Sequence, residues 1–182
     1  MTRWGWCKVY NSALVSYNFC GVIMAILPIR VFPDPILKQK SKRVRTIDGS
    51  VQRLIGSMIE TLHYIHAAGL AAPQVGFPLR IIVVGIPEKG DIVLINPEVV
   101  RRKGECLVDE GCLSVPDYRG EIMRAEAVTV KGRDQNWKEI RIKADGLLAQ
   151  ALQHEIDHLK GILYIDHPET KIYKIEPGEA EL

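Results

Sequence analysis

The chain has 182 residues, enough for one domain with a sizeable hydrophobic core. Hydrophobic residues make up 47% and charged residues 25%, an ordinary composition for a soluble globular protein. The net charge is +2, and Arg3 and Lys8 near the start account for it, so the remainder of the chain is balanced. Bulk charge therefore gives no reason to expect binding to nucleic acid or to a membrane surface.

The first 23 residues differ from the rest, because they contain no acidic residue. The apolar stretch from Ala13 to Leu27 is interrupted by polar residues and is too short for a membrane helix, which needs roughly 20 residues. Met24 begins Met-Ala-Ile-Leu-Pro-Ile-Arg, which looks like a natural start. We therefore expect residues 1–23 to be an extension from an over-extended start, with a targeting segment as the alternative, and residues 24–182 to form the functional domain.

The cysteines bear on the cellular location. They show no Cys-x-x-Cys spacing and are too few for a disulfide framework in a domain of this size; they are Cys7, Cys20, Cys106 and Cys112. We therefore expect a reduced protein of the cytoplasm. If residues 1–23 were a transit peptide, the location would instead be organellar.

The predicted elements begin after residue 24. Residues 24–48 are punctuated by prolines, which favours extended segments and turns. Apolar residues then recur at helical spacing from Ser50 to Ala68 and predict a helix with one buried face. Asp48 or Ser50 can cap its start, and Gly69 marks its end.

The middle of the chain predicts two β-hairpins, because its segments are rich in β-branched residues and are separated by turn residues. The expected strand pairs are Arg80–Ile86 with Asp91–Ile95, across Glu88-Lys89-Gly90, and Ala127–Lys131 with Lys138–Lys143. A last helix follows from about Gly146 to Lys160, with Asp145 as N-cap and Gly161 as its stop. Strands and helices do not alternate, so we expect an α+β fold with antiparallel or mixed sheets packed around this last helix.

The last helix contains His154-Glu155-Ile156-Asp157-His158, a His-Glu-x-x-His pattern. Two histidines four residues apart lie one turn apart on one helix face, so both imidazoles can reach one metal ion. Water on such an ion has its pKa lowered to about 7, and Glu155 can take its proton. On its own the pattern also fits a surface helix that happens to carry two histidines.

A catalytic metal usually has three protein ligands and one open position. Downstream of His158 the candidates lie at a turn or near the C-terminal tail, and none is on a following helix. Cys112, in Glu-Gly-Cys-Leu-Ser, is the better third ligand, because a thiolate binds iron or zinc strongly. The alternative is a buried, inert cysteine. Gly111 removes side-chain bulk and Leu113 places a backbone N–H beside the cysteine, which favours the metal site.

A third segment, Gly69-Leu70-Ala71-Ala72-Pro73-Gln74, surrounds one glutamine with small residues. Small side chains allow other backbone to approach closely, and an uncharged amide donor suits a developing oxyanion. The segment also fits a tight helix-to-strand turn with a surface glutamine. Taken alone, it favours that second interpretation.

Together these segments resemble the three signature motifs of peptide deformylases: Gly-x-Gly-Leu-Ala-Ala-x-Gln, Glu-Gly-Cys-Leu-Ser and Gln-His-Glu-x-Asp-His. Here they stand at residues 67–74, 110–114 and 153–158, in that order and with fitting spacing. The resemblance covers nearly everything from about Met24 to Asp166. It departs at Ala67, where the family has glycine, and we expect the added methyl group to narrow the entrance of a substrate pocket.

The resemblance implies ferrous iron held by Cys112, His154 and His158, with zinc or another divalent transition metal able to replace it. It implies hydrolysis of the N-formyl group from the N-terminal formyl-methionine of nascent polypeptides at the ribosome, with release of formate. It implies no reading of nucleic acid and no membrane contact. A metal-dependent hydrolase of protein biosynthesis is therefore expected.

Roles for individual residues follow from the same resemblance. Glu155 is implied as the acid/base, and Gln74 and the Leu113 backbone N–H as donors to the oxyanion. A hydrophobic pocket for the methionine side chain is implied, lined by residues at or near Ala68, Gly69, Gly111, Leu113, Leu147 and Gln150. Arg119 resembles an arginine that helps to hold the peptide backbone in related enzymes.

Two other functions remain open on the residues alone. An endopeptidase would share the His-Glu-x-x-His pattern, but Cys112 in place of a downstream carboxylate argues against it. A non-catalytic, metal-stabilised binding module would need the three ligands but no base, so Glu155 argues against it.

Overall fold

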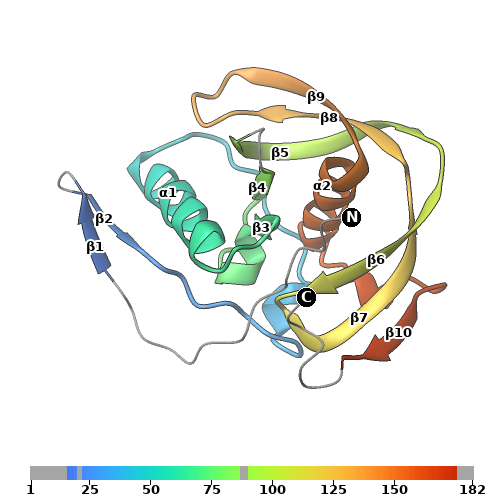
Figure 1. Cartoon of the computed structure of the whole chain (residues 1–182). Helices are drawn as coiled ribbons and strands as arrows, with labels where there is room; N and C mark the ends of the chain where they lie inside the picture. The colour runs from blue at the N-terminus through green and yellow to red at the C-terminus, as the bar shows by residue number, and fades with distance from the viewer. Residues whose placement is uncertain (1–15, 20–21, 87–89, 176–182) are drawn as a thin grey trace.

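The computed structural model describes residues 16–19, 22–86 and 90–175, with side chains from residue 25 onward. Its helices are η1 (Pro35–Lys38), α1 (Gly49–Tyr64), η2 (Ala72–Val75), α2 (Gly146–His158) and η3 (Tyr164–Asp166). Its strands are β1 (Ser16–Phe19), β2 (Val22–Ala25), β3 (Gly69–Ala71), β4 (Ile81–Ile86), β5 (Gly90–Lys103), β6 (Cys106–Cys112), β7 (Val115–Arg124), β8 (Ala127–Arg133), β9 (Glu139–Asp145) and β10 (Lys171–Lys174). All pairs between these strands are antiparallel, and the expected α+β class is confirmed (Figure 1).

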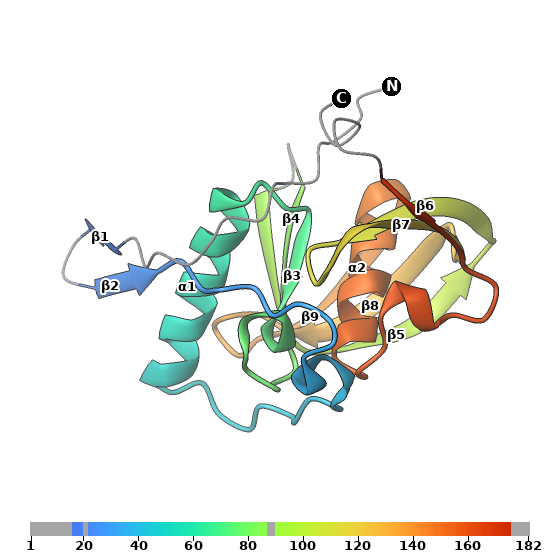
Figure 2. The ribbon, with the colours of Figure 1, turned by 90° about the horizontal axis from the view of Figure 1, so that it is seen from below.

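The larger sheet has the strand order β3-β4-β5-β8-β9 and lies between the two long helices. Figure 2 shows β3 and β4 with α1 on one side and α2 on the other. Alternate residues of β4 serve the two faces: Ile81 and Val83 pack in the cluster with α1, and Ile82 and Val84 pack in the cluster with α2. The strand is therefore an unbroken apolar run, as expected of a strand buried on both faces.

A smaller sheet has the order β10-β7-β6. It covers a separate core that contains Leu37 from η1 and Leu163 and Tyr164 from the segment after α2. In Figure 1 α2 lies between the two sheets. As a result every residue from Ala151 to His158 is buried, including the polar ones. A helix buried this completely must find partners for its polar side chains inside the protein.

Helix α1 has a side-chain cap at its start, and its apolar face packs on the sheet. The Asp48 carboxylate accepts hydrogen bonds from the backbone N–H groups of Ser50 and Val51, at 2.9 and 3.0 Å. The helix ends at Tyr64, four residues before the expected Ala68. His66 adopts a left-handed φ of 52°, so the helix cannot continue through it.

Helix α2 agrees with its expected range, ending at His158 instead of Lys160. Asp145 occupies the N-cap position, but its side chain makes no capping hydrogen bond. Gly161 has a φ of 76°, and a Cβ there would lie 2.5 Å from the Lys38 carbonyl oxygen. Glycine therefore ends the helix as expected, and it also allows the segment around η1 to approach closely.

Both expected hairpins are present, as β4 with β5 and β8 with β9. The turn at residues 87–89 lies outside the described residues. Strand β5 continues to Lys103, well beyond the expected Ile95, and bends through two register shifts against β8. The strands β3, β6, β7 and β10 were not expected from the sequence.

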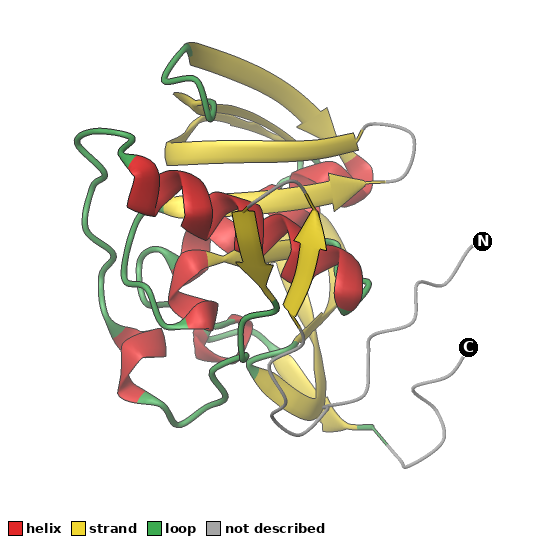
Figure 3. Cartoon of the chain, turned by 90° about the vertical axis from the view of Figure 1, so that its left-hand side faces the viewer, coloured by secondary structure: helices red, strands yellow, loops and turns green. Residues whose placement is uncertain are grey.

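The segment from residue 25 to residue 48 is extended apart from the short helix η1, in agreement with its prolines. It runs past all three motif segments, and Figure 3 shows it among the green loops between the helices. Three of its backbone N–H groups donate to carbonyl oxygens within or directly after these motifs: Arg30 to Gln74 (2.7 Å), Phe32 to Ser114 (2.8 Å) and Ser41 to Leu159 (3.0 Å). One segment thus links the three motifs through the backbone.

Strands β1 and β2 pair as a hairpin, and β2 lies beside α1. The Ala25 and Leu27 N–H groups donate to hydroxyl oxygens of α1, those of Ser57 and Thr61. The expected boundary between residues 23 and 24 falls inside β2 and stays a prediction. Among the described residues, no helix is both long and apolar enough to cross a membrane.

The cap of α1 generates a prediction. Asp48→Ala should lower the Tm by about 2 to 4 °C, the usual loss when a side chain that caps a helix is removed from a chain of this size. Asp145→Ala is the matched control, because Asp145 occupies the same position in α2 without a capping hydrogen bond. Thermal unfolding checks both variants. Equal losses from the two would mean that the Asp48 hydrogen bonds do not stabilise α1.

Candidate metal centre

Helix α2 brings two histidines to one place. His154 and His158 are 7% and 1% exposed, and their ring centroids lie 4.9 Å apart with planes inclined at 76°. They lie one turn apart on the same face, as the spacing of four residues requires. The face they share is directed toward β6, because His154 contacts Glu110 and His158 contacts Cys112.

Cys112 is the last residue of β6, where the strand meets a two-residue turn, Leu113-Ser114, that leads into β7. A register shift between Gly111 and Cys112 bends the strand there. The Cys112 Sγ lies 3.3 Å from His158 Nε2, and the nearest ligand atoms of Cys112, His154 and His158 all lie within 4.8 Å of one another. The structure therefore brings the three expected ligands together.

This set of donors fits a divalent transition metal. One thiolate and two imidazoles leave a position open in a four-coordinate site, as in catalytic centres. Burial, with the positive charge of His154, lowers the pKa of His158 well below its ordinary value, so that imidazole is neutral and able to bind a metal. Burial opposes protonation of His154 too, but Cys112 and Glu110 raise its pKa well above the ordinary value.

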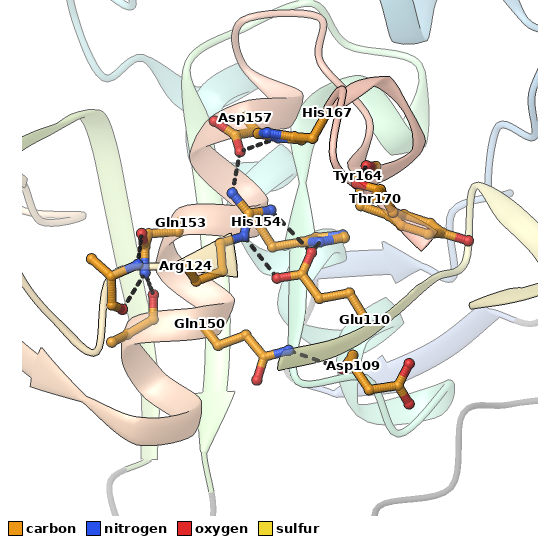
Figure 4. Close-up of polar contacts among 12 residues, drawn as sticks. Asp109, Glu110, Arg124, Gln150, Gln153, His154, Asp157, Tyr164, His167 and Thr170 are labelled. Atoms are coloured by element: carbon orange, nitrogen blue, oxygen red, sulfur yellow. Dashed lines mark hydrogen bonds and ion pairs between the residues drawn. The ribbon is translucent and has the colours of Figure 1, made fainter. Parts of the chain in front are cut away.

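Glu110 fixes the orientation of His154. Its Oε2 lies 2.9 Å from His154 Nδ1 (Figure 4). This contact leaves Nε2 of His154 free to bind a metal together with Cys112 and His158. Glu110 is only 2% exposed. Burial opposes its ionisation, but His154 and Arg124 hold its pKa at about 2, so the carboxylate is charged.

Glu155 lies next to the ligands and is 3% exposed. Among the described residues nothing hydrogen-bonds to its Oε2. Burial raises the pKa of Glu155 from 4.5 to about 7. Its carboxylate lies against Gly69, where a Cβ would come within 2.5 Å of Oε1. Only glycine at residue 69 therefore leaves space for this position of the acid.

Gln74 lies on η2, on the other side of the cysteine, and is 2% exposed. Its Oε1 accepts from the Ala71 backbone N–H at 2.8 Å. This bond directs the amide NH2 to the site, where Nε2 lies 3.6 Å from Cys112 Sγ and 3.3 Å from Ser114 Oγ. Gln74 is thus a buried donor of fixed orientation, and not the surface side chain that its segment alone favoured.

A small pocket lies beside Glu155 between the edge strands β3 and β6 and the start of α2. Its lining contains Ala68, Gly69, Gly111, Leu147 and Gln150, but not Leu113, which was also expected at the pocket. Arg119 is not among the lining residues: it lies opposite Gly111 in the next strand, and its Nε donates to Asp109 at 2.6 Å. Ala67 is outside the lining as well, so the expectation that its methyl group narrows this pocket is not supported.

Three residues of the site were given no role by the sequence: Glu110, Arg124 and Asp157. Arg124, at the end of β7, donates to both oxygens of Glu110, at 2.8 and 3.0 Å. Asp157 belongs to the third motif but was given no role of its own. Its carboxylate accepts a hydrogen bond from Arg124. Arg124 is in the strand that pairs with β6, and the sequence does not reveal the register of that pairing. No local pattern could therefore have identified Arg124.

The three ligands generate a second prediction. Cys112→Ala, His154→Ala and His158→Ala should each lose most of the bound metal, because each removes one of the three donors that the described residues bring together. Cys106→Ala is the control, since Cys106 is on the same strand but outside the cluster. Metal analysis of the purified variants checks this. Full occupancy in Cys112→Ala would eliminate the cysteine as a ligand.

A third prediction concerns Glu155 in the metal-free protein. Its folded pKa of about 7 lies above the ordinary 4.5, so its contribution to stability is complete below pH 4.5 and is lost as the pH rises through 7. Glu155→Gln removes this loss. The variant should match the wild type near pH 4 and exceed its free energy of unfolding by about 3 kcal/mol at pH 8. Urea unfolding at both pH values checks this, and a difference independent of pH would contradict it.

The chain matches known proteins over most of its length. The family model described as polypeptide deformylase matches residues 26–172. The peptide deformylase of Dehalococcoides mccartyi is 52% identical over 159 residues, which cover 86% of this chain and 95% of that protein. The peptide deformylase of Thermodesulfovibrio yellowstonii is 51% identical over 163 residues, covering 87% of this chain and 94% of that protein.

Solved structures of peptide deformylases are also similar to this chain. The crystal structure of a peptide deformylase from Legionella pneumophila has a TM-score of 0.76 and 46% identity, covering 78% of this chain and 85% of that one. The peptide deformylase from Synechococcus elongatus in complex with actinonin has a TM-score of 0.74 and 39% identity, covering 77% of this chain and 79% of that one. The family expected from the three motifs is confirmed. The chain belongs to the peptide deformylase family, metal-dependent hydrolases that remove the N-formyl group from nascent polypeptides.

Proposed function

We propose that this chain hydrolyses the formyl group of N-terminal formyl-methionine with a ferrous ion held by Cys112, His154 and His158. The observation that carries this is the convergence of three buried donor atoms within 4.8 Å, with the carboxylate of Glu155 next to them. A divalent ion held there supplies Lewis acidity, which polarises a carbonyl group and makes water more acidic near neutral pH. Zinc or another divalent transition metal suits the same donors.

Glu155 transfers the proton. It takes a proton from the attacking water and gives it to the amide nitrogen as the C–N bond breaks, so that formate and a free amine leave. Its pKa of about 7 in the metal-free protein supports this role, because such a group can both accept and release a proton near neutral pH. Gly69 supports it too, since the absence of a side chain there leaves space for the carboxylate.

Gln74 and the Leu113 backbone N–H stabilise the oxyanion that forms on the formyl oxygen. The hydrogen bond from Ala71 holds the Gln74 amide with its donors toward the cysteine. Leu113 follows Cys112 directly, in the turn between β6 and β7, so its N–H is the next backbone donor after the cysteine. Donors fixed before the reaction need no reorganisation as the charge develops.

The pocket between β3 and β6 takes the methionine side chain, and the peptide that follows leaves along the strand edges. Both strands are edges of their sheets among the described residues, so their backbones can pair with an extended peptide. Gly69 and Gly111 expose backbone at the pocket without side-chain obstruction. Arg119 lies in β7 opposite Gly111, close enough to the same edge to hold peptide backbone farther from the formyl group.

The substrate is then the N-terminus of a nascent polypeptide at the ribosome, and the location is the cytoplasm. The proposal needs no contact with nucleic acid bases. Both cysteines that the structure describes, Cys106 and Cys112, are free thiols, which is consistent with a reducing compartment. An organellar location would require residues 1–23 to act as a transit peptide.

Formate release from formyl-Met-Ala tests the proposal on protein loaded anaerobically with iron. Formyl-Met-Ala should be hydrolysed faster than formyl-Ala-Ala, because the pocket beside Gly111 takes an apolar side chain, whereas casein should not be cleaved. Glu155→Ala should keep its metal and lose kcat by at least about 10²-fold, a usual acid–base contribution. Gly69→Ala should also lower kcat with the metal retained, because its Cβ displaces Glu155.

Two outcomes would contradict the proposal. Cleavage of casein without formate release would favour an endopeptidase. A metal-loaded protein that turns over neither substrate would favour a metal-stabilised binding module. Near-normal turnover by Glu155→Ala would remove that residue from the reaction while leaving the metal site in place.

A further inference from the structure

Asp157 lies between the two histidine ligands in the sequence, yet its side chain turns away from them. It is 7% exposed, and its Oδ2 accepts a hydrogen bond from Arg124 Nη1. Figure 4 shows it on the far side of Arg124 from Glu110. The proposed reaction gives Asp157 no role, although it is a buried carboxylate one residue from a ligand.

Arg124 connects Asp157 to the ligands. Its Nε and Nη2 donate to the two oxygens of Glu110, and Glu110 Oε2 is paired with His154 Nδ1. A continuous chain therefore runs from His154 through Glu110 and Arg124 to Asp157. Arg124 is 6% and Glu110 2% exposed, so the inner part of the chain is buried.

The charges of this chain do not cancel. Arg124 is positive, and its guanidinium donates hydrogen bonds to both Glu110 and Asp157, so each buried carboxylate has a cation as its partner and keeps its charge. The three side chains together carry one net negative charge behind His154. In a buried setting such a charge attracts a nearby cation more strongly than it would in water.

The outer end of the chain reaches solvent. Asp157 Oδ1 accepts from Lys160 Nζ at 2.8 Å, and its Oδ2 lies 3.2 Å from His167 Nε2. The side chains of Lys160 and His167 are 40% and 31% exposed. Solvent screens charges in such positions, so they offset the buried charge of the chain only weakly.

We propose that Asp157 is a positioning residue that sets the metal affinity of the site. Because Arg124 is also paired with Asp157, the guanidinium does not cancel the negative charge of Glu110. Glu110 therefore keeps a negative charge that orients His154 and attracts the cation. Without Asp157, Arg124 and Glu110 cancel, and the site loses the negative charge behind its first histidine. This inference rests on the proposed metal site but not on the reaction that the site performs.

Competition of Zn²⁺ with a chelator tests the inference on the full chain, because zinc is redox-inert and its Kd is independent of turnover. Asp157→Asn keeps the shape of the side chain and removes its charge. We expect it to weaken zinc binding about 10- to 100-fold, the usual range when a partner behind a ligand is changed. The cobalt-substituted variant should keep the thiolate absorption band of the wild type, since all three ligands remain.

A double variant separates charge from structure. Asp157→Asn with Arg124→Gln again leaves one net negative charge behind His154, and it should recover much of the zinc affinity that Asp157→Asn loses. If the ion pair only stabilised the fold, the double variant would bind zinc more weakly than Asp157→Asn alone. Lys160→Met is the matched control, because it removes a solvent-exposed partner of the same carboxylate and should change the Kd by less than about fivefold.

Three results would overturn the inference. The first is a Kd for Asp157→Asn within about fivefold of the wild type. The second is a double variant that binds zinc more weakly than Asp157→Asn, and the third is failure of both variants to fold, which would show that the ion pair serves the fold. A wild-type chain that binds no zinc would overturn the proposed metal site as well, which distinguishes that failure from the failure of Asp157 alone.

Discussion

The contact between Glu110 on β6 and His154 on α2 is the interaction on which the rest of the site depends. It joins two segments 44 residues apart and places a charged carboxylate where almost no water reaches it. An isolated buried carboxylate is costly, so it requires a buried cation with good geometry. Arg124 meets that requirement with two hydrogen bonds, and its own burial is then balanced by Asp157. Gln153 adds a neutral link, because its amide bonds both the N–H and the C=O of Ala125, the residue after Arg124.

The same constraint explains how the fold is arranged. A helix with a polar, buried face needs polar partners on every side, and here two sheets and the segment before α1 provide them. That segment bonds to the backbone at Gln74, Ser114 and Leu159, so the donor, the turn after the cysteine and the end of α2 keep their spacing. Close approaches need glycine at two points: Gly69 accommodates Glu155, and Gly161 accommodates the backbone of Lys38. The rigid surroundings allow the reacting groups to be placed before substrate arrives.

The parts of this arrangement that follow local rules could be predicted from the sequence. The periodicity of α1 and α2, the two hairpins and the three ligands depend on spacing within an element or on motif resemblance. The smaller sheet could not be predicted, because Pro116, Gly120 and several charges break the alternation in β7. Arg124 and Asp157 could not be predicted either, because the register of β6 against β7 decides which side chain meets Glu110. Asp48 and Asp145 looked equivalent as caps, yet only Asp48 makes the hydrogen bonds.

The central claim is that side chains from β6 and α2 form one metal centre, and the X-ray absorption spectrum of the zinc-substituted chain tests it most directly. The structure predicts one sulfur at about 2.3 Å and two imidazole nitrogens at about 2.0 to 2.1 Å, with oxygen in the remaining position. That result would place Cys112, His154 and His158 on the same ion. A spectrum with nitrogen and oxygen neighbours and no sulfur would contradict the account, because β6 would then contribute no ligand.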